Sequence, residues 1–204
     1  MRRPGPDGVR ARLRDGPGPR GLRISSVPSP FHSTTVLAVR REGSTTLAAD
    51  GQVTLGDIVV KHGARKLRRM SDGAILAGFA GATADAQALF AKFETKLEAH
   101  RGNLERACVE LAQDWRTDRV LRHLDALLLV ADKDHVFLLS GDGDLMQPDD
   151  GIMAIGAGAP FAMAAARALA SRTELTAREI AEEAMRVTDG ICIYTNGQVI
   201  YEEV

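Results

Sequence analysis

Hydrophobic and polar residues alternate along most of this chain in patterns that predict strands and amphipathic helices. Residues 34–40 and 44–49 are rich in β-branched side chains and alternate in polarity, and the Glu42–Gly43 pair between them is typical of a turn. These two runs predict a hairpin. A second hairpin is predicted over 66–80, where an Asp-Gly pair separates two further alternating runs.

Helical spacing follows, with apolar residues recurring every three or four positions. One stripe runs over 86–97 and a second over 104–115, with Asn103 placed to cap the second helix. Two more helices are expected near the other end of the chain, an alanine-rich one over 159–170 and one over 176–187 that begins with a capping-box pattern. The sequence therefore predicts two helix pairs.

Further strands are expected between and after the helix pairs. Alternating or apolar runs occupy 126–131, 135–140 and 152–155, and a last hairpin is expected from 191–195 and 198–202. The order of strands, two helices, strands, two helices and strands predicts an α+β domain. Two sheets packed face to face with a helix pair outside each would bury every stripe, which is a four-layer αββα sandwich.

Residues 1–33 differ in composition from the rest. They are rich in arginine, proline and glycine, and they lack the apolar core of a secretory signal. A propeptide, a basic tail and a misassigned start codon all fit this composition. We expect a disordered extension that is absent from the mature protein, followed by a single domain over 34–204.

Composition excludes several classes of function. The formal net charge is -1, which gives no electrostatic case for binding nucleic acid or an anionic membrane. The chain has no apolar run of about 18 residues, so no membrane-spanning helix is expected. Cys108 and Cys192 are expected to be buried free thiols, which fits a reducing, cytoplasmic location.

The sequence lacks the motifs of the common catalytic triads and of zinc sites. The five histidines have no nucleophile motif such as G-x-S-x-G nearby, and neither HExxH nor CxxC occurs, which argues against a triad and against zinc. An N-terminal threonine instead carries its own base, because its α-amine has a pKa of about 8. Thr34 would gain that amine only after cleavage from Ser33.

Such a site needs three further groups. A cation near the amine keeps the amine neutral, a carboxylate holds that cation, and a backbone N–H stabilises the oxyanion. Lys66, Asp50 and the glycine-containing strand end at 77–81 are the candidates. Their spacing alone does not prove that they converge.

Several motifs, in order, resemble the proteasome β-subunit family, and most closely its bacterial branch. They are 50–56 (DGQVTLG), 77–85 (AGFAGATAD), 114–119 (DWRTDR) and 191–196 (ICIYTN). The resemblance extends from about residue 31 to 203. It implies an αββα sandwich of the N-terminal-nucleophile hydrolase type.

The resemblance also implies roles for individual residues. Thr34 would be nucleophile and base, Asp50 and Lys66 its supporting ion pair, and the Gly78 N–H the oxyanion donor. It implies a threonine endopeptidase whose nucleophiles lie inside a dodecamer of two stacked hexameric rings. An AAA+ ATPase would unfold protein substrates and feed them in, so ATP would be used by that partner.

A monovalent cation, Na⁺ by expectation, is also implied, held by the backbone carbonyls of Asp189, Cys192 and Thr195. The chain departs from the family at the first of these positions, where glycine is usual. It also has Ala157 where a serine usually lies near the nucleophile's amine.

Plainer interpretations remain open beside these. Thr34 could be an ordinary strand residue, Asp50 a turn residue, and Lys66 part of a solvated basic face. The segment 156–158 (GAG) lacks the Gly-Lys-Ser/Thr of a phosphate loop, which argues against nucleotide binding by this chain. Two rival functions are an N-terminal-nucleophile amidohydrolase for small molecules and a non-catalytic ring subunit.

Overall fold

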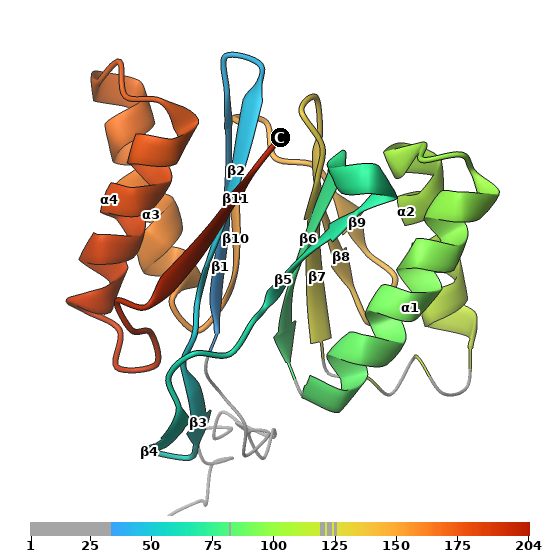
Figure 1. Ribbon diagram of the computed structural model, residues 1–204, viewed down its shortest axis with the longest axis horizontal. Helices are drawn as coiled ribbons and strands as arrows, with labels where there is room; N and C mark the ends of the chain where they lie inside the picture. Colours follow the sequence, from blue (N-terminus) through green and yellow to red (C-terminus); the bar gives the residue numbers. More distant parts are fainter. Residues whose placement is uncertain (1–33, 82, 119–120, 122–123, 125) are drawn as a thin grey trace, which may run out of the picture.

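The computed structural model describes residues 34–81, 83–118, 121, 124 and 126–204, and the extension expected at 1–33 lies outside the described residues. Two antiparallel sheets face each other, and each carries a pair of helices on its outer face (Figure 1). The predicted four-layer α+β sandwich is therefore confirmed.

The first sheet has four strands in the order β10-β1-β2-β11. They are β1 (Thr35–Arg41), β2 (Ser44–Asp50), β10 (Ile152–Gly156) and β11 (Val199–Glu203). The β1–β2 hairpin was predicted, and its turn has positive φ at both Glu42 (53°) and Gly43 (80°). Such a turn matches the right-handed twist of the strands that it joins.

The second sheet has five strands in the order β5-β6-β7-β8-β9. They are β5 (Leu67–Met70), β6 (Ile75–Gly81), β7 (Ala126–Ala131), β8 (Val136–Ser140) and β9 (Leu145–Met146), and a short 3₁₀ turn, η1 (Ser71–Gly73), joins β5 to β6. All neighbouring strands are antiparallel. Short connections join β5 to β6, β7 to β8 and β8 to β9, whereas α1 and α2 lie between β6 and β7 in the chain. The predicted second hairpin is thereby confirmed.

The helices are α1 (Thr83–Ala99), α2 (Leu104–Thr117), α3 (Ala159–Arg172) and α4 (Ala177–Asp189). The Asn103 side chain accepts a hydrogen bond from the Arg106 N–H and so caps α2, as predicted. Thr176 and Glu179 form the predicted capping box at the start of α4. Both caps satisfy backbone donors that a helix start leaves open.

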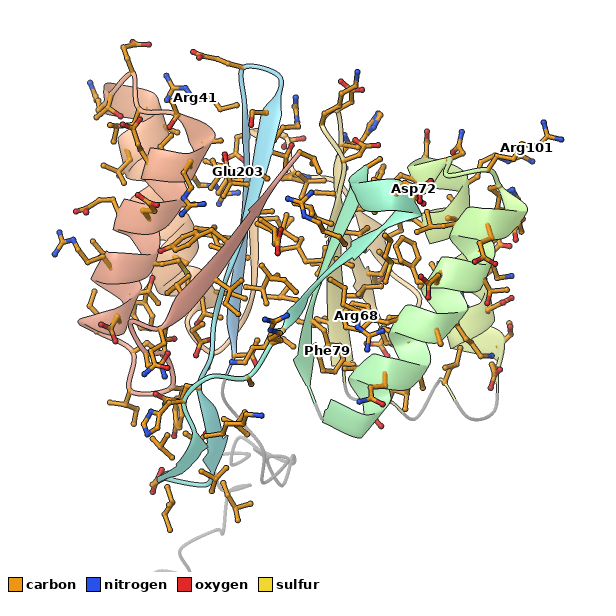
Figure 2. All side chains as sticks on the ribbon, viewed as in Figure 1. Arg41, Arg68, Asp72, Phe79, Arg101 and Glu203 are labelled. Carbon is orange, nitrogen blue, oxygen red and sulfur yellow. The ribbon has the colours of Figure 1, made fainter. Side chains whose placement is uncertain are left out.

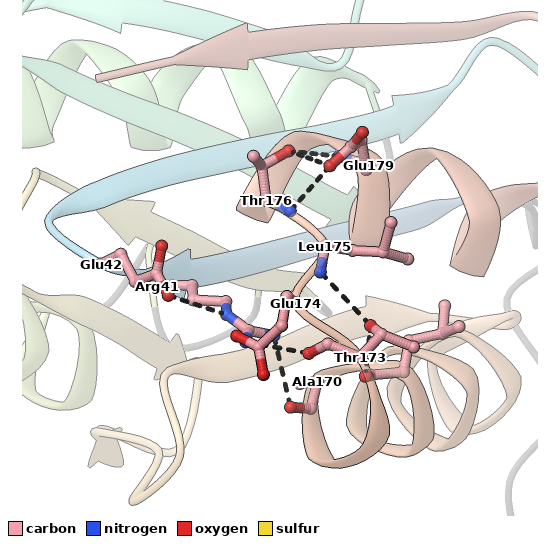
Figure 3. Close-up of polar contacts among 9 residues, drawn as sticks. Arg41, Glu42, Ala170, Thr173, Glu174, Leu175, Thr176 and Glu179 are labelled. Atoms are coloured by element: carbon pink, nitrogen blue, oxygen red, sulfur yellow. Dashed lines mark hydrogen bonds and ion pairs between the residues drawn. The ribbon is translucent and has the colours of Figure 1, made fainter.

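Arg41 at the end of β1 ties the first sheet to the connection between α3 and α4 (Figure 3). Its guanidinium donates to the carbonyls of Ala170 (3.3 Å) and Thr173 (2.9 Å) and lies 3.4 Å from the Glu174 carboxylate. Since the last carbonyls of a helix have no partner within it, the arginine both caps α3 and fixes the loop.

Three buried clusters fill the spaces between the layers. One lies between the five-stranded sheet and α1 with α2, and includes Phe93 and Trp115; another lies between the four-stranded sheet and α3 with α4. The third joins the two sheets and includes Val36 and Leu129. The stripes predicted from helical spacing thus all face apolar partners.

The final predicted hairpin is wrong in its first half. Residues 191–195 form turns, with the Cys192 N–H bonded to the Thr188 carbonyl and the Thr195 N–H to the Cys192 carbonyl. Strand β11 pairs with β2 instead. An apolar run followed by the Asn196–Gly197 pair suggested a hairpin, but the run forms a turn that leaves Ile191 and Ile193 exposed and buries Cys192.

A small hairpin of β3 (Val53–Leu55) and β4 (Ile58–Lys61) was not predicted. It extends beyond the end of the four-stranded sheet, below the sandwich in the view of Figure 1. None of the helices in the described part of the chain is long and apolar enough to cross a membrane. Cys108 and Cys192 are both free and buried, as expected.

Replacing Phe93 by alanine should destabilise the fold by about 3–5 kcal/mol, because its fully buried ring leaves a cavity between α1 and the sheet. Phe161, which is 38% exposed on α3, is the matched control, and its alanine variant should lose less than about 1 kcal/mol. Urea unfolding of both variants measures the difference. Equal losses would contradict the placement of these helices.

Candidate active site

The Asp50 carboxylate, at the end of β2, is fully buried and receives hydrogen bonds from three groups. The Thr35 N–H donates to Oδ1 at 2.7 Å, the Gln52 N–H to Oδ2 at 2.9 Å, and the Lys66 ammonium to Oδ1 at 2.9 Å. A buried charge is tolerated only when it is paired and hydrogen-bonded in this manner. Asp50 therefore joins β1, the start of the β3 hairpin and Lys66.

Lys66 directly precedes β5, and its side chain is 8% exposed. Its Nζ donates to Asp50 and, at 2.6 Å, to the Gln52 carbonyl. Burial lowers the pKa of Lys66 below its ordinary value, although the charge and the hydrogen bond of Asp50 oppose that shift. The plainer interpretation of Lys66 as part of a solvated basic face is thereby excluded.

Thr34 precedes β1 and is 7% exposed. It lines, together with Lys66, a cavity of about 80 Å³. The backbone of Thr34 packs closely against Gly156, where a Cβ would overlap the Thr34 carbonyl oxygen. Glycine at 156, with φ of 92°, thus permits β10 to hold Thr34 at the edge of this cavity.

Part of the cavity lining is apolar. Phe79 from β6 and Phe90 from α1 contribute to it, with their ring centroids 6.3 Å apart. Arg68 lies over the Phe90 ring, 4.8 Å from its centroid (Figure 2). An apolar lining with a few polar groups is typical of sites that accept organic ligands.

Gly78 lies in the middle of β6 and is paired with Leu67 on one side and Leu129 on the other. A Cβ at this position would come 2.6 Å from Val36 Cγ1, so glycine is needed for the two sheets to approach. The cavity itself is lined by Phe79 and Gly81 of the same strand. The oxyanion role of the Gly78 N–H stays a prediction.

The three positions expected to bind a cation lie in one compact segment. Asp189 is the last residue of α4, where helical backbone needs no glycine, so the departure at this position brings no strain. The Thr195 N–H bonds the Cys192 carbonyl at 3.0 Å, which closes the turn. Among the described residues, no group of three or more His, Cys, Asp or Glu side chains could hold a metal. Any cation here would therefore depend on carbonyl oxygens.

Thr35 and Gln52 belong to this site although the sequence analysis assigned a role to neither. Thr35 is fully buried, and its hydroxyl lies 2.6 Å from that of Thr195. Gln52 is 4% exposed, and its side chain donates to the Ile193 carbonyl at 2.8 Å. The sequence signals that could have found them are polarity beside Thr34 and Asp50 and, for Gln52, its place in the 50–56 motif. Ala157, at the position of the usual serine, is exposed between two close-packed glycines.

Changing Gly158 to alanine should destabilise the protein by about 1–3 kcal/mol, because its Cβ would overlap the Thr35 hydroxyl and lie 2.7 Å from Thr195 Oγ1. Gly63 is the matched control, since an alanine there meets one atom, 3.8 Å away. Thermal unfolding at fixed protein concentration compares the two variants. A Gly158→Ala protein as stable as Gly63→Ala would contradict this packing.

Comparison with known proteins agrees with this geometry. Residues 31–204 match the family described as proteasome subunit. The chain is 62% identical over 174 residues to the ATP-dependent protease subunit HslV of Pseudothermotoga lettingae, covering 85% of this chain and 99% of that protein. It is 58% identical over 179 residues to the HslV of an Anaeromyxobacter species, covering 86% and 99%.

A solved structure of eukaryotic HslV from Trypanosoma brucei superposes with a TM-score of 0.79 at 45% identity, covering 83% of this chain and 98% of that one. The resemblance in the motifs is thus confirmed by both sequence and structure. The chain therefore belongs to the proteasome family, in the branch that contains the HslV subunits of ATP-dependent proteases.

Proposed function

We propose that Thr34, once it is the N-terminus, is the nucleophile of this protease subunit and cleaves peptide bonds of unfolded proteins. The observation that carries the proposal is that Thr34 and Lys66 line one cavity, while Lys66 is held by the buried Asp50. No such arrangement is needed for an ordinary strand threonine. It also disfavours a non-catalytic ring subunit, which has no use for a buried ion pair at this place.

The proposed reaction can be followed through the transfer of one proton between the Thr34 hydroxyl, the Thr34 α-amine and the leaving nitrogen. The α-amine of Thr34 takes the proton from its own Oγ, and the oxygen attacks the carbonyl carbon of the scissile bond. The tetrahedral intermediate collapses as the C–N bond breaks and the amine returns the proton to the leaving nitrogen. Water then hydrolyses the ester. The Lys66 ammonium favours a neutral α-amine by repulsion, and the Gly78 N–H would stabilise the oxyanion.

The same chemistry implies that the segment before Thr34 is removed or never made. While Thr34 remains joined to Ser33 its nitrogen is an amide and cannot act as a base. The domain boundary at 33–34 is thus part of the proposal. A small-molecule amidohydrolase is disfavoured because the chain is 58–62% identical to HslV protease subunits over nearly their whole length.

An HslU-type AAA+ unfoldase is the proposed partner, with ATP used by that partner. The support is that the HslV relatives are subunits of ATP-dependent proteases, while this chain carries no phosphate-loop motif. A cytoplasmic location stays a prediction that rests on the free thiols.

Self-association as two stacked hexameric rings is proposed on the basis of an apolar surface. The β3–β4 hairpin exposes large hydrophobic side chains, among them Ile58 (68%) and Val60 (54%), and the neighbouring turn exposes Ile191 (56%) and Ile193 (74%). The hydrogen bond from the Asn196 side chain to the His62 carbonyl joins the two segments. An exposed patch of this kind is typical of a protein interface.

A monovalent cation, Na⁺ by proposal, fits the carbonyls of Asp189, Cys192 and Thr195. Neutral backbone carbonyls suit a hard, singly charged ion, and the closed turn keeps these positions close together. Such an ion would neutralise the carbonyl dipoles and stiffen the turn beside Thr35.

Thr34→Ala should abolish peptide hydrolysis while leaving the fold and the assembly intact, because the variant lacks only the nucleophilic hydroxyl. The measurement is cleavage of a fluorogenic peptide, with and without the ATPase partner, by protein that begins at position 34, with the N-terminus verified by intact mass. Thr117→Ala, at an exposed position at the end of α2, is the control and should keep full activity. Undiminished hydrolysis by Thr34→Ala would contradict the proposal.

Ile58→Asp should shift the protein from rings toward smaller species, because it places a charge in the apolar surface of the β3–β4 hairpin. Size-exclusion chromatography with light scattering measures the mass. The matched control is Val109→Asp on α2, where the original side chain is 39% exposed and outside that surface. If both variants form the same species as the unchanged protein, this hairpin is not the interface.

A further inference from the structure

Gln52 makes hydrogen bonds through all three of its polar parts within the site. Its N–H donates to Asp50 Oδ2 at 2.9 Å, its carbonyl accepts from Lys66 Nζ at 2.6 Å, and its side-chain amide donates to the Ile193 carbonyl at 2.8 Å. The residue is 4% exposed. A buried amide held at its far end has little freedom to move its own backbone.

These bonds are part of a closed circuit of contacts that begins and ends at the Asp50 carboxylate and passes through Gln52, the turn 193–195 and Thr35. From Asp50 the circuit passes through Gln52 to the turn at Ile193, and along the turn to Thr195. The Thr195 hydroxyl lies 2.6 Å from the Thr35 hydroxyl, and the Thr35 N–H returns to Asp50 Oδ1 at 2.7 Å. The turn 192–195 is thus attached to the ion pair from two sides.

We propose that Gln52 is a positioning residue for the threonine chemistry, in that its side-chain amide anchors the Asp50–Lys66 pair to the turn 192–195. The inference rests on the proposed function of Thr34. Gln52 touches no reacting atom in this scheme. It acts by keeping its own carbonyl on the Lys66 ammonium and its own N–H on Asp50.

The direction of the effect follows from the charge on Lys66. The Gln52 carbonyl accepts a hydrogen bond from the protonated amine and therefore stabilises the charged form. Burial already lowers the pKa of Lys66, so the loss of this acceptor would lower it further. If catalysis needs Lys66 charged, the fall in activity as the pH rises would then begin at a lower pH.

The test is Gln52→Met in protein that begins at Thr34 and is assembled with its ATPase partner. Methionine has nearly the same length and removes the donor to Ile193 without adding a charge. We expect kcat to fall about tenfold with KM changed by less than about twofold, since misplaced groups slow the chemical step rather than substrate binding. In a plot of kcat against pH, the decline on the basic side should move to lower pH.

Gln113→Met is the matched control, because Gln113 is exposed on α2, remote from these contacts. It should leave kcat and the pH profile unchanged. The Thr195→Val variant removes the hydroxyl on the other side of the circuit and keeps its backbone carbonyl. If Gln52 and Thr195 both position the Asp50–Lys66 pair, the fold-loss of kcat in the double variant should be smaller than the product of the fold-losses in the two single variants.

Two results would overturn the inference. One is a Gln52→Met protein with kcat within about twofold of the unchanged chain. The other is a lower kcat with an unmoved decline on the basic side and a matching loss of folded, assembled protein, which would indicate a structural role. Failure of the proposed function is seen separately, because Thr34→Ala would then remain active whatever Gln52→Met does.

Discussion

The buried carboxylate of Asp50 is the constraint on which the rest of this site depends. It lies in a water-free position at the end of β2, where an unpaired charge would be strongly destabilising. Three donors therefore have to be brought to it, and they come from β1, from the start of the β3 hairpin and from the residue before β5. Meeting this one requirement places Lys66 beside the cavity that Thr34 also lines.

The two sheets make that convergence possible. Asp50 ends a strand of the four-stranded sheet, and Lys66 directly precedes a strand of the five-stranded sheet, so the ion pair links the two sheets. Glycine at 78 lets Val36 approach β6, and glycine at 156 lets β10 approach the Thr34 backbone. A bulkier residue at 78 would hold the two sheets apart, and one at 156 would push β10 away from Thr34 within its own sheet. Packing of the core is thereby linked directly to the geometry of the nucleophile.

The turn after α4 connects the site to the surface. It carries Thr195 and Ile193, which contact Thr35 and Gln52, and its exposed isoleucines continue the apolar surface of the β3–β4 hairpin. A neighbouring subunit packed on that surface, as proposed above, would contact the turn that holds Thr35 and Gln52. The proposed assembly and the proposed catalysis would then depend on the same turn.

The sequence by itself determined the layered architecture, the helix caps and the family, because these depend on local periodicity and on motifs contiguous in the chain. It also singled out Thr34, Asp50 and Lys66 as candidates. Only the tertiary structure decided that Lys66 is buried, since alternation beside Leu67 cannot show that a residue preceding a strand turns inward to a carboxylate 16 positions away. The turn at 191–195 was misread as a strand because an apolar run followed by an Asn-Gly pair is also typical of a hairpin. Gln52 escaped notice for a related reason, as its partner lies 141 residues further on and only folding brings them together.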